Sequence, residues 1–293
     1  MTGSSTPNTA NDGATNGSDR ASETASDRAS DPGPTLGLAL GGGAVLGFAH
    51  IGLLAALEEG GIETDCVAGT SAGAIAAALH AFRVEPDRIR EILSPLTWRK
   101  VSGFTRTSMG LLTNEPMGEL LEEELGDARI EDAGIPLAIV AADIHTGERV
   151  VLRDGLVAEA VRASAAIPGI YTPIEIDGRL LVDGGVVDNV PVAALRDMGA
   201  DVAVAATLGD ALDFDEVNNL LGVLTNAFLI MVNTSTRLSL ELDRADVVIQ
   251  PDLEPHNHWD MKQQDELIKK GRTAGAAAIS QIRDALEAAS ASG

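Results

Sequence analysis

From residue 35 onward, short apolar runs alternate with segments whose apolar residues recur at intervals of three and four. Short runs bounded by turn residues predict buried strands, and the three-to-four spacing predicts helices. Strands are expected at residues 35–40, 65–69, 135–144, 148–153, 200–208 and 246–251 and in a hairpin over 174–183. Helices are expected at residues 48–61, 71–82, 87–96, 114–126, 155–167, 191–199, 215–243 and 260–289. This alternation is typical of an α/β fold in layers, with residues 99–113 irregular.

The first 34 residues contain Ser, Thr, Asn, Asp and Gly and almost no bulky apolar side chain. Such a composition cannot form a core, so residues 1–34 are expected to be a disordered tail and residues 35–290 one domain. No apolar run typical of a secretory signal is present, and no stretch reaches the roughly 18–20 apolar residues that cross a bilayer. The longest apolar stretch, Leu220–Val232, is interrupted by polar residues and predicts a core or interface helix.

One cysteine, Cys66, excludes an internal disulfide, and its place in an apolar strand predicts a small buried hydrophobe. A soluble, cytoplasmic protein is therefore expected. The formal net charge is −23. Acidic charge of this size repels nucleic acid, so a DNA-binding role is disfavoured. It is tolerable where concentrated salt screens it, which suggests a halophile; an acidic protein of an ordinary cell is the alternative.

A single polar residue, Ser71, stands between a predicted strand and a predicted helix in the stretch Gly69-Thr70-Ser71-Ala72-Gly73. Serine is a common helix N-cap, because its oxygen accepts hydrogen bonds from the first turn. The same G-x-S-x-G spacing forms the nucleophile elbow, in which a tight turn exposes the serine oxygen. The pattern alone leaves both interpretations open, and a base and oxyanion donors are needed to decide for the elbow.

Three consecutive glycines, Gly41 to Gly43, follow the first predicted strand and precede a helix. Glycines let successive N–H groups point into one concave site, and a helix N-terminus favours an anion there. An oxyanion site and a dinucleotide phosphate site both use this arrangement. The dinucleotide pattern G-x-G-x-x-G is broken, because Ala44 stands between Gly42 and Gly47 where its middle glycine belongs. The loop therefore favours an oxyanion site.

Asp183 directly follows an apolar strand and precedes Gly184-Gly185. A carboxylate at a strand end, followed by residues without side chains, can approach another group closely, so Asp183 is the candidate base. An ordinary Asp-Gly turn is the alternative. Asp188 and Asn189 are interpreted as loop residues without a catalytic role.

Four stretches, taken together and in order over residues 36–207, resemble the patatin-like phospholipases: LALGGGAVLGFAHIGLLAALEE, GTSAGAIAAAL, ASAAIPGIYTPIEIDGRLLVDGGVVDNVPV and GADVAVA. The resemblance implies a three-layer α/β/α fold with a central, mostly parallel sheet. It implies hydrolysis of lipid carboxylic esters through a covalent acyl-enzyme, with Ser71 as nucleophile and Asp183 as proton acceptor. It further implies an oxyanion hole at Gly42, Gly43 and Ala44 and supporting glycines at Gly41, Gly47, Gly69, Gly73, Gly184 and Gly185.

The sequence departs from that family in the glycine-rich loop, which usually has a fourth glycine in place of Ala44 and an arginine or lysine in place of Leu46. A backbone N–H survives both changes, so the oxyanion site is expected to persist, while the lost cation affects how the loop is positioned. A regulatory or lipid-binding protein with little turnover is the alternative that these changes leave open.

An aspartate is a poor base at neutral pH unless burial raises its pKa, and the apolar strand before Asp183 would do so. No metal or other cofactor is required. The expected partner is a lipid or other ester substrate, with at most peripheral membrane contact. A Ser-Asp-His order would be completed by His256 or His258, although their polar, Pro-bounded loop is typical of a connection. His50, Trp98 and Trp259 are expected to pack or anchor rather than react.

Overall fold

The structure is a computed structural model that describes residues 33–105, 107–209 and 218–291. The predicted disordered tail, apart from residues 33 and 34, and the start of the helix predicted at 215 lie outside the described residues. The strands are β1 (Leu36–Leu40), β2 (Cys66–Thr70), β3 (Gly103–Phe104), β4 (Leu112–Thr113), β5 (Leu137–Asp143), β6 (Arg149–Leu152), β7 (Ile174–Ile176), β8 (Arg179–Asp183), β9 (Val202–Ala206) and β10 (Val247–Ile249). The helices are α1 (Phe48–Glu59), α2 (Ala72–Ala81), α3 (Pro86–Leu93), α4 (Trp98–Val101), α5 (Glu115–Leu125), α6 (Val157–Ser164), α7 (Val192–Asp197), α8 (Leu220–Leu242) and α9 (Gln264–Ser290).

The main sheet has eight strands and is mostly parallel. Five parallel strands follow one another in the order β10-β9-β1-β2-β5. β8 and β6 both pair with β5 in antiparallel fashion, and β7 pairs with β8. The hairpin predicted over 174–183 is present as β7–β8, and Asp177 and Gly178 both have the positive φ that a two-residue hairpin turn uses. β5 and β6 form a second hairpin.

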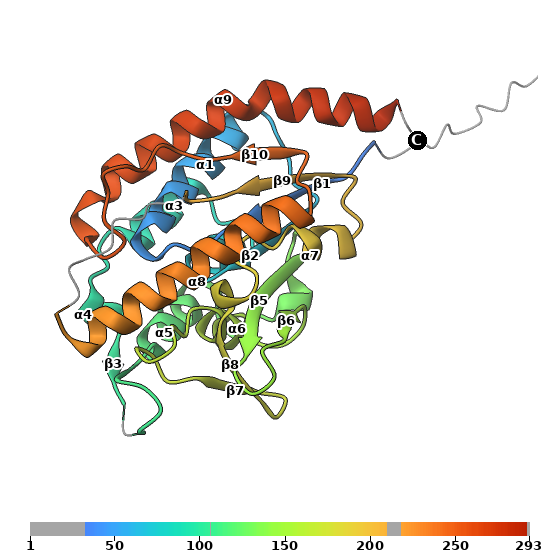
Figure 1. The fold of residues 1–293 in the computed structure, drawn as a ribbon. Coiled ribbons are helices and arrows are strands. Elements are labelled where there is room, and N and C mark those ends of the chain that lie inside the picture. Colours follow the sequence, from blue (N-terminus) through green and yellow to red (C-terminus); the bar gives the residue numbers. More distant parts are fainter. Residues whose placement is uncertain (1–32, 106, 210–217, 292–293) are drawn as a thin grey trace, which may run out of the picture. The chain divides into compact units, whose positions relative to one another are not determined.

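Helices cover both faces of this sheet, which gives three α/β/α layers (Figure 1). Strand β1 shows how the sequence separates the faces. Leu38 and Leu40 pack into the large core beneath α1, α2 and α9, whereas Ala39, between them, packs into a smaller core beneath α7. Successive residues of a strand point to opposite faces, so the leucines of β1 face the larger core and Ala39 faces the smaller one. Helix α1 is apolar and buried over most of its length, and α9 packs against it.

Strands β2 and β8 meet end to end along one edge of β5, and this is the feature of the fold that builds the site. Thr70, the last residue of β2, pairs with Val140, and Asp183, the last residue of β8, pairs with Ala141, the next residue of β5. Strand β6 occupies the other edge of β5 at both positions. The residues that follow β2 and end β8 are therefore brought against each other.

Several local expectations differ from the structure. Residues 99–113 were expected to be irregular, but they contain most of α4 and the short β3–β4 hairpin. Asn114 stands at the N-cap position of α5 without capping it: its Nδ2 donates to the carbonyl of Arg162, and its Oδ1 accepts no hydrogen bond from the described residues. Trp98 and Trp259 pack against each other, with ring centroids 5.6 Å apart. Cys66 is buried, as predicted. Within the described ranges, no helix is both long enough and apolar enough to cross a membrane.

Candidate active site

Ser71 occupies a strained turn between β2 and α2, with φ 54° and ψ −121°. A residue with a side chain adopts this conformation only when its surroundings enforce it, and such strain gathers at functional sites. A Cβ at Gly69 would collide with the backbone of Gly73, and a Cβ at Gly73 would collide with the carbonyl of Leu40. Both flanking positions therefore require glycine, and the serine side chain makes no capping bond to α2. The geometry is that of a nucleophile elbow rather than an N-cap.

The Ser71 hydroxyl donates a hydrogen bond to Asp183 Oδ2 at 2.7 Å. Asp183 is fully buried, and its Oδ1 accepts from the N–H of Gly185 at 2.8 Å. Burial raises the pKa of Asp183 to about 7, although the bonds from Ser71 and Gly185 oppose that rise. A carboxylate with this pKa can take up and release a proton near neutral pH.

Hydrogen bonds also fix the backbone of Ser71. Its N–H donates to Ser164 Oγ at 2.8 Å, and Ser164 Oγ donates in turn to the carbonyl of Val140 at 2.5 Å. Ser164 is fully buried at the end of α6. Sequence reasoning missed this residue; a lone serine in the apolar stretch Val161–Ile167 was the available signal.

The glycine-rich loop lies directly on the elbow. A Cβ at Gly42 would stand 3.0 Å from Ser71 Cβ, and one at Gly47 would stand 2.5 Å from Ala72 Cβ. The carbonyl of Gly41 bonds His50 Nε2 at 2.8 Å, and burial lowers the pKa of His50 to about 4, so a neutral His50 holds the start of the loop. His50 is thus buried against the start of the glycine-rich loop, which agrees with the packing role predicted for it.

The three predicted oxyanion donors are not equivalent. The N–H of Gly42 already donates to Asn189, to Oδ1 at 3.1 Å and to the backbone carbonyl at 3.3 Å. Among the described residues, the N–H groups of Gly43 and Ala44 have no such acceptor. An oxyanion site would therefore rest on Gly43 and Ala44, with Gly42 fixing the loop.

An apolar cavity of about 100 Å³ begins at Ser71. Its walls come from the glycine-rich loop, α1, α2, α5 and the stretch after α6, and include Ala44, Phe48, Ile75, Leu121 and Ile167. A cavity with this lining suits a hydrocarbon chain, with the polar Ser71 at one end. Within the described part of the chain, no group of three or more His, Cys, Asp and Glu residues is placed to hold a metal ion.

The family of the chain follows from comparison with known proteins. The family profile described as "Patatin-like phospholipase" matches residues 38–196. The chain belongs to this family. The matched region runs from β1 to α7 and so includes the glycine-rich loop, Ser71 and Asp183.

Similar patatin-like proteins are known from bacteria and fungi. An uncharacterized NTE family protein of Mycobacterium tuberculosis is 37% identical over 178 residues, 60% of this chain and 49% of the relative. Lysophospholipase NTE1 of Saccharomyces cerevisiae is 32% identical over 187 residues, 62% of this chain and 11% of that protein. The chain thus spans about half the length of the mycobacterial relative and far less of the yeast one. The crystal structure of VipD from Legionella pneumophila has a similar fold, with a TM-score of 0.54 and 14% identity over 88% of this chain and 67% of VipD.

The two departures from the usual patatin-like loop have structural consequences. Ala44 has a φ of 50°, in the left-handed region that glycine adopts without strain. Leu46 is fully buried in the main core, and its N–H donates to the carbonyl of Gly43 at 3.1 Å. Apolar packing therefore holds the loop where the family usually has a cation.

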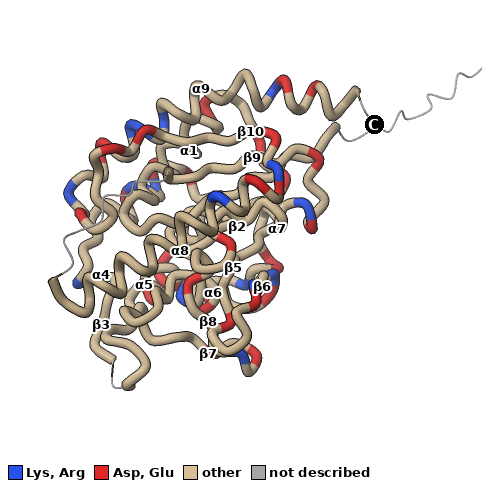
Figure 2. Tube along the Cα trace, in the orientation of Figure 1, with Lys and Arg blue, Asp and Glu red and all other residues tan. Residues whose placement is uncertain are grey.

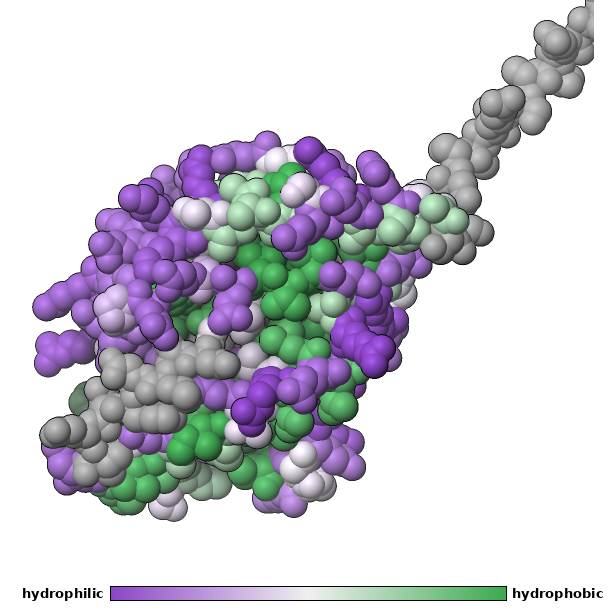
Figure 3. Space-filling view, turned by 45° about the horizontal axis from the view of Figure 1, so that its top comes forward, coloured by the Kyte–Doolittle hydropathy of each residue, from purple (hydrophilic) through white to green (hydrophobic). Residues whose placement is uncertain are grey.

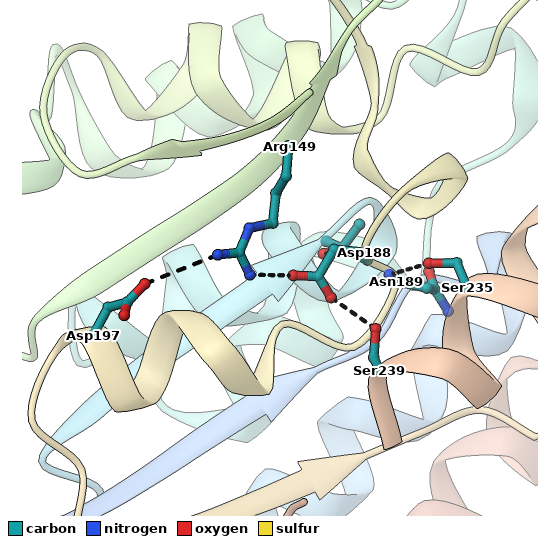
Figure 4. Close-up of polar contacts among 7 residues, drawn as sticks. Arg149, Asp188, Asn189, Asp197, Ser235 and Ser239 are labelled. Atoms are coloured by element: carbon teal, nitrogen blue, oxygen red, sulfur yellow. Dashed lines mark hydrogen bonds and ion pairs between the residues drawn. The ribbon is translucent and has the colours of Figure 1, made fainter. Parts of the chain in front are cut away.

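Asp188 and Asn189 lie in a loop, as predicted from the sequence, but both side chains are buried and hydrogen-bonded (Figure 4). Asp188 accepts from Arg149 at 2.9 Å and from Ser239 Oγ at 2.9 Å. Burial raises the pKa of Asp188, and the bonds from Arg149 and Ser239 oppose the rise. The N–H of Asn189 donates to Ser235 Oγ at 2.9 Å. The pair thus ties the polar face of α8 to the loop.

The two histidines considered for a triad lie between β10 and α9. His256 Nδ1 bonds the carbonyl of Leu253 at 2.8 Å and Nε2 bonds Glu266 at 2.9 Å, so both ring nitrogens are occupied. The carbonyl of His258 accepts from the N–H of Val45 at 3.1 Å, which supports the loop after Ala44. Both side chains are buried. These positions are consistent with a structural role for His256 and His258.

Proposed function

We propose that this chain hydrolyses carboxylic esters of lipids, with Ser71 as nucleophile and Asp183 as the base. The observation that carries the proposal is the 2.7 Å hydrogen bond from Ser71 to Asp183, made at a strained elbow that opens onto an apolar cavity. The family, and the lysophospholipase named among its relatives, support a lipid ester as the substrate class. The cytoplasmic location inferred from composition stays a prediction.

In the first half of the reaction, Ser71 Oγ attacks the ester carbonyl carbon and its proton passes to Asp183 Oδ2. The tetrahedral intermediate collapses, Asp183 returns the proton to the departing alkoxide, and an alcohol leaves. In the second half, water attacks the acyl-enzyme and gives a proton to Asp183. The acid is released as Ser71 recovers its proton, so one ester and one water yield one acid and one alcohol.

The negative charge that develops on the carbonyl oxygen needs donors beside Ser71. The N–H groups of Gly43 and Ala44 suit this part, because the glycine-rich loop lies against the elbow and neither group has another acceptor among the described residues. Preorganised donors of this kind are worth about 10²- to 10³-fold in kcat each.

Intact mass after treatment with a fluorophosphonate probe tests the proposal without a guess at the substrate. We expect one adduct on the wild-type chain and none on Ser71→Ala. Ser94→Ala is the matched control, because Ser94 Oγ is buried and has no hydrogen-bond partner within the described residues. An adduct that persists on Ser71→Ala would place the nucleophile elsewhere.

A lipid-binding or regulatory protein with little turnover is the second candidate. It is favoured by Ala44, whose strained φ of 50° stands at an expected oxyanion donor. A chromogenic ester separates the two: a hydrolase releases p-nitrophenol in a burst followed by turnover, and a binding protein releases none.

A further inference from the structure

Large apolar side chains that are exposed to solvent gather on two segments of the described chain. One is the β3–β4 hairpin, where Phe104 is 96% exposed, and the other is α8. Elsewhere in the described residues, only Ile144 and Val248 are both large and exposed. We use the name apolar rim for six side chains of these segments: Phe104, Met109, Leu111, Leu220, Leu221 and Val223. Figure 3 shows apolar surface along the lower edge of the view, in contrast to the hydrophilic upper left. An exposed apolar patch of this kind marks an interaction surface.

The apolar rim borders the entrance to the candidate active site. Phe104, Leu111 and Leu221 line a groove of about 810 Å³. The inner wall of this groove is formed by side chains that also line the cavity at Ser71, namely Trp98, Ile167 and Tyr171. An acyl chain that enters beside the rim would therefore reach Ser71 along a continuous apolar surface.

The described residues of this face carry little negative charge. The whole chain has 44 acidic and 21 basic residues, yet residues 97–114 contain three basic residues and no acidic one. Residues 218–236 contain no charged residue at all. Figure 2 shows the same contrast, with little red on α4, β3 and the first half of α8. Arg99 and Lys100 are exposed at the edge of the rim, and neither forms an ion pair within the described residues.

Two other occupants of the face fit these observations less well. The first 34 residues have no bulky apolar side chain beyond Met1, so they cannot cover an apolar rim. A second copy of the chain has the same net charge of −23, and long-range repulsion opposes its approach. A zwitterionic lipid surface has no net charge, takes up apolar side chains and presents phosphate oxygens to Arg99 and Lys100.

We propose that the apolar rim docks on the surface of a phospholipid bilayer, so that its side chains enter the acyl layer while Arg99 and Lys100 contact lipid phosphates. Docking places the mouth of the groove against the bilayer, where a substrate chain can pass to Ser71 without crossing water. Delivery of a substrate chain to Ser71 rests on the proposed hydrolysis, whereas binding of the apolar rim to the bilayer does not.

Flotation of the full chain with phosphatidylcholine vesicles tests the docking, in a Ser71→Ala background so that the vesicles stay intact. Phe104→Asp and Leu221→Asp are each compared with Ile144→Asp, which introduces the same charge at an exposed apolar residue outside the rim. We expect each rim variant to lower vesicle partition about tenfold or more, because an apolar side chain that would enter the acyl layer is replaced by a charge. Ile144→Asp should bind as the parent does.

Equal flotation of all these variants, or no flotation of the parent, would overturn the docking. So would light scattering in which the parent is a dimer and the rim variants are monomers, because the face would then join two copies. Turnover of a soluble short-chain ester, measured on the parent with Ser71 restored, tests the hydrolysis separately from the docking. A parent that floats but turns over no ester would leave the docking standing and would remove the proposed hydrolysis.

Discussion

Asn189 holds the backbone of Gly42 on both sides. Its Oδ1 accepts from the N–H of Gly42 at 3.1 Å, and its Nδ2 donates to the carbonyl of the same residue at 3.2 Å. A further bond from Nδ2 to Thr236 Oγ1 at 2.8 Å ties the amide to α8. Because the next two N–H groups are the proposed oxyanion donors, the side chain of Asn189 fixes the direction in which they point.

Replacing Asn189 with aspartate should therefore impair turnover more than substrate binding. The variant keeps the shape of the side chain but puts a carboxylate oxygen against the carbonyl of Gly42 and removes a donor from a buried site. We expect kcat to fall by about ten- to a hundredfold, less than the loss of a donor itself, with KM changed little. Asn233→Asp is the control, since Asn233 Nδ2 has no partner in the described chain. A folded Asn189→Asp with the parent kcat would show that the loop holds its shape unaided.

The pKa of Asp183, raised to about 7 by burial, predicts the direction of two pH effects. As a base, Asp183 must be ionised, so kcat/KM should increase as the pH rises through about 7. Asp183→Asn should lower the rate by roughly 10²- to 10⁴-fold, the usual range for a lost general base. A pH profile that is flat between pH 5 and 8 would contradict the assignment.

The raised pKa of Asp183 also makes the stability of the folded chain depend on pH. In the unfolded chain the carboxyl ionises near its ordinary value of 3.8, so the buried charge costs the folded state increasingly as the pH rises from about 4 to 7. Asp183→Asn carries no such charge. Its thermal stability relative to wild type should therefore be greater at pH 8 than at pH 4. If the difference in melting temperature between Asp183→Asn and wild type is the same at pH 4 and pH 8, Asp183 is not buried as a charge.

Particular residues show which features of the candidate site could be predicted from the sequence. Ser71 and Asp183 stand in short local patterns, at a G-x-S-x-G turn and at a strand end, and both could be named in advance. Their meeting could not be derived from pattern alone, because it depends on β2 and β8 sharing one edge of β5, a pairing between segments more than 100 residues apart. Asn189 looked like a turn residue, and only the apolar residues around it, in VVDNVPV, hinted at burial.

The net charge of −23 predicts a response to salt. Added KCl screens the repulsion between like charges, since the Debye length falls from about 10 Å at 0.1 M to about 3 Å at 1 M. The melting temperature should therefore rise between dilute and molar KCl, as expected of a protein adapted to a salt-rich cell. Calorimetry across this range is the measurement, and a flat or falling melting temperature would remove the halophile interpretation.

The last prediction separates a dyad from a triad. His256 and His258 follow Asp183 along the chain and could complete a Ser-Asp-His order, but His256 uses both ring nitrogens on Leu253 and Glu266. Alanine at His256 and at His258, separately and together, should leave kcat within about tenfold of wild type, because neither ring accepts the proton of Ser71. Both residues are buried, so some loss of thermal stability is expected and turnover must be measured well below the melting temperature. A collapse of turnover in a double variant that is still folded by circular dichroism would mean that a histidine, and not Asp183, is the base.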